Sequence, residues 1–172
     1  MSISIVLTVI SDDRPGIVEV LSQTLASHGG NWVESSMLSL AGKFAGILMA
    51  QVPDGQADAL ITDLKALNKS GLQLVVERTN AQARPAGARE FSLELVGQDR
   101  PGIVRDITRI LAKHQVNVEE LDTECQEASM SGETLFIAQA RLLIPADASL
   151  DALQDELEDL ANELMVDIKL ED

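Results

Sequence analysis

The sequence repeats itself. Residues 13–31 read DRPGIVEVLSQTLASHGGN, and residues 99–117 read DRPGIVRDITRILAKHQVN. Ten of the 19 aligned positions are identical, and the offset of 86 residues is half of the 172-residue length. This period is longer than the roughly 20–50 residues of solenoid repeats. The sequence therefore predicts two copies of one small domain rather than a single long one.

The boundary between the copies is expected where the composition changes. Residues 80–89 are rich in small residues and contain Pro and Gly, which is typical of a linker. We therefore predict a first unit over residues 1–79, a linker over residues 80–89 and a second unit over residues 90–172.

Each copy has the pattern of a strand, a helix, two strands, a helix and a strand. Helices are expected to begin at Pro15 and Pro101, because proline suits the first turn of a helix, and to end at His28 and His114. Further helices are expected on the leucine stripes of residues 60–67 and 150–164. A tight turn is expected at residues 41–42 and a longer loop at residues 126–133. Strands are expected at residues 3–10, 32–40, 43–52, 72–77, 91–96, 118–125, 134–144 and 166–170.

This element order predicts an α+β fold with two ferredoxin-like βαββαβ sandwiches in tandem. Each sandwich is expected to have an antiparallel four-stranded sheet with two helices on one face, because a sheet this small must cover one apolar face. The other face or an edge of the sheet is then free to pair with another copy.

Charge and composition exclude several classes of function. The net charge is −15, with −2 on residues 1–86 and −13 on residues 87–172, which disfavours binding to nucleic acid or an anionic membrane. The sequence has no long apolar run and no signal-peptide pattern at its start, so we expect a cytoplasmic protein. The single cysteine, Cys125, excludes an internal disulfide and a cysteine-rich metal site. The acidic segment 151–172 is expected to be a solvated helix face or a docking surface for a basic partner.

The DRPGI motif, placed after a strand and before a helix and followed by Asn ahead of the next strand, resembles the ACT domain. ACT domains are a family of small regulatory modules that bind amino acids and other small molecules. A pair of such units without an attached enzyme resembles the glycine cleavage system transcriptional repressor family in particular. The resemblance implies the sheet order 4-1-3-2 and a ligand bound where ACT units meet. No cofactor and no metal are expected.

The resemblance also implies which residues bind the ligand, namely the loop after the first strand and the start of the second. A helix start favours a carboxylate, aspartates suit an ammonium group, and asparagine both donates and accepts. Aspartate as a helix cap is the structural alternative. Because Ser11 and Asp12 are replaced by Gly97 and Gln98, we expect the two sites to differ. The candidate residues are Asp12, Asp13, Arg14, Pro15, Gly16, Ile17, Asn31, Asp99, Arg100, Pro101, Gly102, Ile103 and Asn117.

The predicted function is that of a non-enzymatic regulator. By resemblance, it senses a small amino acid, with glycine as the family-based choice, and modulates a LysR-type transcriptional activator through protein contact. A homo-oligomer is expected. The alternative is an ACT-type interaction module that needs no ligand. No nucleophile elbow, phosphate loop or dinucleotide fingerprint is present, and His28 and His114 lack the partners of a metal site.

Overall fold

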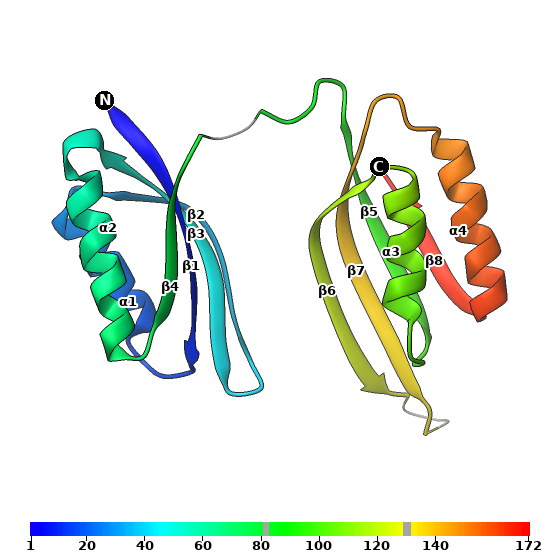
Figure 1. The fold of residues 1–172 in the computed structure, drawn as a ribbon. Coiled ribbons are helices and arrows are strands. Elements are labelled where there is room, and N and C mark those ends of the chain that lie inside the picture. Colours follow the sequence, from blue (N-terminus) through cyan, green and yellow to red (C-terminus); the bar gives the residue numbers. More distant parts are fainter. Residues whose placement is uncertain (81–82, 129–131) are drawn as a thin grey trace. The chain divides into compact units, whose positions relative to one another are not determined.

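The computed structural model describes residues 1–80, 83–128 and 132–172. The chain divides into two compact units, residues 1–82 and residues 83–172. In each unit a four-stranded sheet carries two helices on one face (Figure 1). The division lies within the segment of residues 80–89, after the last strand of the first unit.

The two units have the same order of elements. Unit 1 contains β1 (Ser2–Asp12), α1 (Ile17–Ser27), β2 (Asn31–Leu40), β3 (Lys43–Pro53), α2 (Ala57–Ala66) and β4 (Gln73–Thr79), with short 3-10 helices at Asp54–Gln56 and Leu67–Ser70. Unit 2 contains β5 (Arg89–Gln98), α3 (Ile103–Lys113), β6 (Asn117–Glu127), β7 (Thr134–Ile144), α4 (Leu150–Leu164) and β8 (Val166–Glu171). The sheet orders are β2-β3-β1-β4 and β6-β7-β5-β8, with antiparallel neighbours. The predicted α+β fold and the sheet order are confirmed.

The predicted strands are also confirmed, with ends that differ from the expected ones by at most two residues. The tight turn between β2 and β3 has positive φ at Ala41 and Gly42, the conformation that a two-residue hairpin favours. The prediction of a loop at residues 126–133 can be checked only at its two ends. Glu127 still belongs to β6, and residues 129–131 lie outside the described residues.

The predicted start of the first helix in each unit is wrong by two residues. The helices begin at Ile17 and Ile103, after Gly16 and Gly102, whose φ angles are 93° and 91°. A residue in this left-handed conformation cannot be part of a right-handed helix. Pro15 and Pro101 therefore lie in a turn before the helix rather than in its first turn.

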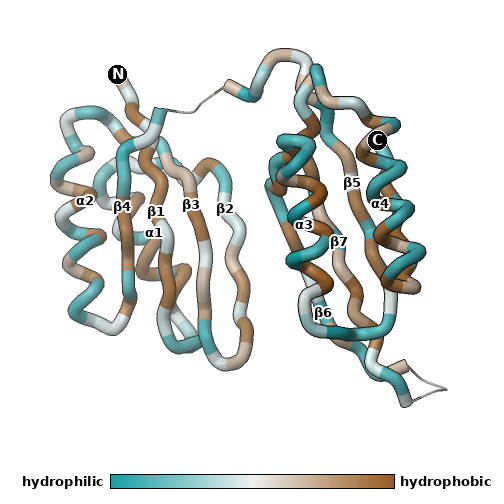
Figure 2. The backbone as a smooth tube through the Cα atoms, turned by 45° about the vertical axis from the view of Figure 1, so that its right-hand side comes forward, coloured by the Kyte–Doolittle hydropathy of each residue, from teal (hydrophilic) through white to brown (hydrophobic). Residues whose placement is uncertain are grey.

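Each unit has its own hydrophobic core. Alternate residues of the strands and the apolar stripes of the helices meet between the sheet and the helices, and the two cores share no residue. Figure 2 shows hydrophobic residues recurring along the strands, whereas the helices alternate between hydrophobic and hydrophilic residues. Among the described residues, no helix combines the length and the apolar character needed to cross a membrane.

The two histidines lie at helix ends, as predicted, and both contact the second helix of their unit. His28 and His114 are the C-cap residues of α1 and α3. His28 Nε2 lies 2.8 Å from an oxygen of Asp63 on α2, and His114 Nε2 lies 3.2 Å from an oxygen of Glu156 on α4. The histidines therefore link the two helices of each sandwich.

The contact at Glu156 predicts a pH dependence of stability. A hydrogen bond from Lys113, at 2.6 Å, is the largest cause that lowers the pKa of Glu156, and His114 adds to it. Because the folded-state pKa is lowered, the stabilisation is complete above the unfolded pKa of about 4.3 and is lost as the pH falls through the folded value. Glu156→Gln should be slightly less stable than the parent protein near neutral pH, and the two should converge in acid, once the pH lies below the lowered folded-state pKa of Glu156.

Urea unfolding followed by far-UV circular dichroism at both pH values measures this difference. Glu158→Gln, an exposed position on the same helix, is the matched control and should show no such convergence. A deficit of Glu156→Gln that stays the same in acid would contradict the assigned role of the carboxylate.

Candidate functional site

The turn after β1 holds most of the candidate residues of unit 1. The Asp13 N–H donates to the carbonyl of Gly42 at 2.9 Å, which ties the turn to the β2–β3 hairpin. The first helical hydrogen bond runs from the Val20 N–H to the Gly16 carbonyl at 3.0 Å. The N–H groups of residues 17–19 therefore have no helical acceptor, which is the arrangement that favours an anion at a helix start.

The same turn is open to solvent. Residues 12–16 are exposed, and a Cβ placed on Gly16 would meet no atom within 4 Å. Ile17, in contrast, is buried in the core of unit 1, and Ile103 is buried in that of unit 2. Their side chains anchor the helices, so at these two positions only the backbone can serve a ligand.

The charged side chains of this turn already have partners. Lys43 forms an ion pair with Asp12, and its hydrogen bond lowers the pKa of that carboxyl group. Ser39 donates to Asp13 at 2.7 Å, and Arg14 donates to the carbonyl of Ser70 at 2.6 Å. Within the described residues no side chain caps α1, so the alternative of an aspartate cap is wrong for this helix.

The corresponding turn of unit 2 has the same backbone conformation, but a side chain lies over its glycine. The Asp99 N–H donates to the carbonyl of Thr134 at 2.9 Å. A Cβ placed on Gly102 would lie only 2.9 Å from Nη2 of Arg105, a position that is Glu19 in unit 1. The Arg105 side chain therefore occupies the space that stays empty beside Gly16.

Arg105 is held in place by a carboxylate. Its Nε donates to Oδ1 of Asp106 at 2.9 Å, and Arg100 Nη2 lies 4.0 Å from Oδ2 of the same residue. The hydrogen bond from Arg105 lowers the pKa of Asp106. The exposed Pro101 completes this turn, which is less open than its counterpart in unit 1.

The two asparagines lie far from the turn of their own unit. In the strand register, Asn31 of β2 lies opposite Gln51 of β3, and Gln51 lies opposite Ser4 of β1. Ser4 precedes Asp13 by nine residues. At about 3.3 Å per residue, this places Asn31 roughly 30 Å from the turn. Asn117 is in the same position in unit 2, where the register passes through Leu143 to Glu90, nine residues before Asp99. The structure therefore does not bring the asparagine and the turn of one unit together.

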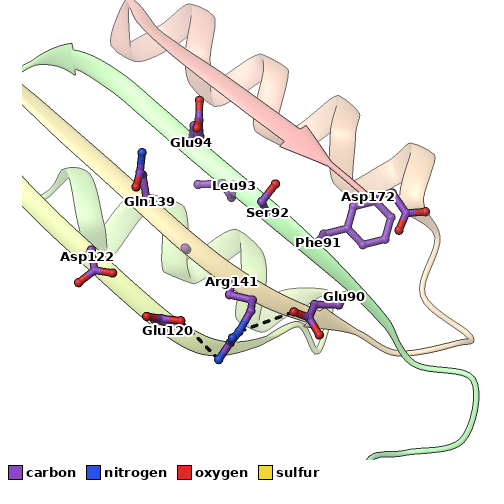
Figure 3. Close-up of a pocket in the computed structure, with 11 residues that line it drawn as sticks. Glu90, Phe91, Ser92, Leu93, Glu94, Glu120, Asp122, Gln139, Arg141 and Asp172 are labelled. Carbon is purple, nitrogen blue, oxygen red and sulfur yellow. Dashed lines mark ion pairs between the residues drawn. The ribbon is translucent and has the colours of Figure 1, made fainter. Parts of the chain in front are cut away.

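The sheet of unit 2 carries a hollow that no sequence motif indicated. It has a volume of about 570 Å³ and lies on the face away from the helices (Figure 3). Arg141 lies in it, 3.4 Å from a carboxylate oxygen of Glu120 and 3.8 Å from one of Glu90. The available signal was the alternation of acids at residues 90–94 and 120–124, since alternate residues of a strand share a face.

Comparison with known proteins identifies the family of both units. Residues 4–77 and residues 91–162 each match a model of the ACT domain. The glycine cleavage system transcriptional repressor of Escherichia coli (strain K12) is 27% identical over 162 residues, which cover 93% of this chain and 85% of that protein. The repressor of the same name from Shigella flexneri matches to the same extent.

A solved structure supports the tandem arrangement over the whole length. The crystal structure of an unknown protein from Galdieria sulphuraria matches with a TM-score of 0.85 at 31% identity, and the match covers 99% of this chain and 98% of that one. Two family matches, one on each sandwich, and full-length similarity to a repressor lead to one conclusion. The chain belongs to the ACT domain family, as a protein of two ACT domains in tandem.

Proposed function

We propose that this protein is a non-enzymatic cytoplasmic regulator that binds a small amino acid at its strand-to-helix turns and acts on a transcriptional activator by protein contact. The observation that carries the proposal is the open turn of unit 1, where Gly16 adopts a left-handed conformation next to free helix N–H groups. The repressors that this chain resembles support a regulatory role.

The turn of unit 1 offers complementary groups to a zwitterion. The N–H groups of residues 17–19 suit the carboxylate of an amino acid, and the positive end of the helix dipole adds to their attraction. A carboxylate can accept several hydrogen bonds, so Asp13 keeps acceptor capacity for an ammonium group after Ser39 has donated to it. Because Arg105 covers Gly102, we place the main site in unit 1. Glycine is the choice that the family resemblance suggests.

Asn31 and Asn117 enter this proposal only as contributions from another ACT unit. Their distance from the turn of their own unit excludes simultaneous contact with one small ligand. A ligand that touches both a turn and an asparagine therefore needs two units, and its binding would be coupled to their association.

The output is a change in the affinity for a protein partner. A ligand shifts that affinity only when it binds the free and the partnered conformations differently. By family resemblance, the proposed partner is a LysR-type activator, and the net charge of −15 suits a basic protein surface rather than nucleic acid or a membrane.

Gly16→Ala tests the site. The new methyl group would occupy the open space beside the turn, and the left-handed backbone would cost about 1–2 kcal/mol. Gly29→Ala is the matched control, because Gly29 also has a positive φ of 67° but lies at the other end of α1. Both variants should be similarly destabilised, whereas only Gly16→Ala should weaken amino-acid binding, by about tenfold or more. Isothermal titration calorimetry with a panel of amino acids measures the binding.

The alternative is an interaction module that works without a ligand. Folded protein that gives no heat with any amino acid, yet still binds its activator, would favour that alternative over sensing. Equal loss of amino-acid binding in both variants would contradict the assignment of the ligand to the turn.

A further inference from the structure

The sheet of unit 1 has an apolar face that its helices do not cover. On β1, Val6 and Ile10 alternate with the core-facing residues and therefore point away from the helices. The strand register places apolar residues of β2, β3 and β4 on the same face. The larger exposed side chains of this face are between 47% and 70% exposed. We call this surface the open face of unit 1. Its apolar residues are Val6, Ile10, Leu38, Leu40, Ala45, Ile47, Met49 and Val75. The charged residues of this face lie at its margins: Glu34 and Glu77 on the two edge strands, and the ion pair of Lys43 with Asp12 at the end of β1.

The same face of unit 2 is charged. Leu38, Ile47 and Val75 occupy the register positions of Glu124, Gln139 and Lys169 in unit 2. Figure 3 shows part of this second face, with several carboxylates around Arg141. The two sheets therefore share a fold but differ in what their free faces can bury.

We propose that the open face of unit 1 is a self-association surface, on which two copies of the chain pair through their unit 1 sheets. The whole face, including the polar residues at its margins, has four strands about 4.8 Å apart and about nine rows of 3.3 Å, and measures roughly 600 Å². Two such faces bury about 1,200 Å², which reaches the lower limit for specific protein interfaces. The pairing is isologous, because the same surface serves on both copies.

Charge selects this occupant over the other sheet. Covering the apolar face with the open face of unit 2 would bury carboxylates such as Glu124 against side chains that cannot pair with them, which is costly. Residues 1–86 carry a net charge of only −2, so two copies of unit 1 meet with little repulsion. Two copies of residues 87–172, at −13 each, would repel one another.

The position of Val75 separates this arrangement from pairing along a sheet edge. Val75 lies on β4, the edge strand opposite β2. Two sheets that joined through their β2 edges would leave Val75 in solvent, whereas face-to-face packing buries it. The proposal does not depend on the amino-acid site, so calorimetry that finds no ligand leaves it intact.

The test measures the mass of the full chain in solution by light scattering and sedimentation. The parent protein should have twice the mass of the 18.5 kDa chain, and high salt should not dissociate it, because the contact is apolar. Val75→Lys alone should weaken dimerisation about 100-fold, and the triple variant L38E/I47Q/V75K should be a monomer. The triple variant carries residues that unit 2 already holds at these positions, and Trp32 fluorescence verifies its fold.

Val18→Glu is the matched control, since Val18 is also an exposed apolar residue, on α1 on the other side of the sheet. It should remain dimeric. A monomeric parent protein, a dimer that Val75→Lys leaves unchanged, or dissociation by Val18→Glu to the same extent would each overturn the proposal.

Discussion

Leu64→Ala is expected to lower the free energy of unfolding of unit 1 by about 2–5 kcal/mol and to leave unit 2 unchanged. Leu64 is fully buried in the core of unit 1, where α2 packs on the sheet. Deleting most of its side chain removes apolar burial and leaves a cavity that the neighbours refill only in part. Because the two cores share no residue, the loss should stay within one unit.

The only tryptophan makes this prediction specific. Trp32 packs against the core of unit 1, so its fluorescence reports on that unit, while far-UV circular dichroism reports on both. Leu157, at the matching place on α4, is the control in unit 2. Leu64→Ala should shift the fluorescence transition in urea to lower concentration, whereas Leu157→Ala should shift only part of the circular dichroism change. A fluorescence transition that moves equally in both variants would show that the units unfold together.

Most of the fold was predictable because its determinants are local. Strands β1 and β5 alternate apolar residues toward one face, and helices such as α4 carry leucines at helical spacing. The repeat then required both halves to adopt the same arrangement. A small sheet with two apolar-faced helices has few ways to bury both, so the pattern leads to the ferredoxin-like sandwich.

The start of the helices was not predictable from proline alone. Pro15 is compatible with a first helical turn, but the glycine that follows it takes a left-handed φ, and the helix can begin only after that residue. The residue types of a turn limit the conformations that it can adopt. The hydrogen bond from the Asp13 N–H to the Gly42 carbonyl selects one of them. That hydrogen bond joins residues distant in sequence, so no local pattern contains it.

The separation of Asn31 from the turn has a similar origin. Helix α1 runs back along the sheet, so β2 starts at the end where β1 starts, and not at the end where β1 leads into the turn. The two motifs are close in sequence because one helix connects them, and that helix also carries the chain away from the turn. The family motif contains both the turn and the asparagine, but a motif in sequence does not contain the distance between them in the fold.

The two free sheet faces differ because the residues on them are not constrained by either core. Leu7 and Val9 in the core of unit 1 correspond to Leu93 and Leu95 in the core of unit 2, while Thr8 on the free face corresponds to Glu94. The fold tolerates both choices, so the face can take on a separate role in each unit. The function of the pair then depends on surfaces that the shared architecture does not determine.

Gly97 takes the place of Ser11 just before the turn of unit 2. A Cβ at Gly97 would lie 2.2 Å from Cγ1 and 2.7 Å from Cβ of Val166, and 3.2 Å from its Cα. The side chain of Val166 therefore fills the space that a residue larger than glycine would need. Gly97→Ala is expected to cost about 1–3 kcal/mol, because β5 and β8 must move apart where they pair.

Ser11→Ala is the matched control in unit 1, where only the 3.0 Å hydrogen bond of the hydroxyl to the carbonyl of Asp12 is lost, at a cost of about 1 kcal/mol or less. Gly97→Ala should shift the circular dichroism transition of unit 2 without moving the fluorescence of Trp32. Combining it with Val166→Gly should cost less than the sum of the two single changes, because the overlap is then removed. Additive costs would mean that the side chain of Val166 is not what excludes a larger residue at position 97. A favourable coupling would mean that packing against Val166 of β8 determines the backbone position at the end of β5. The turn at Asp99 would then be held by strand packing, whereas the turn at Asp13 follows a serine that donates a hydrogen bond to the backbone.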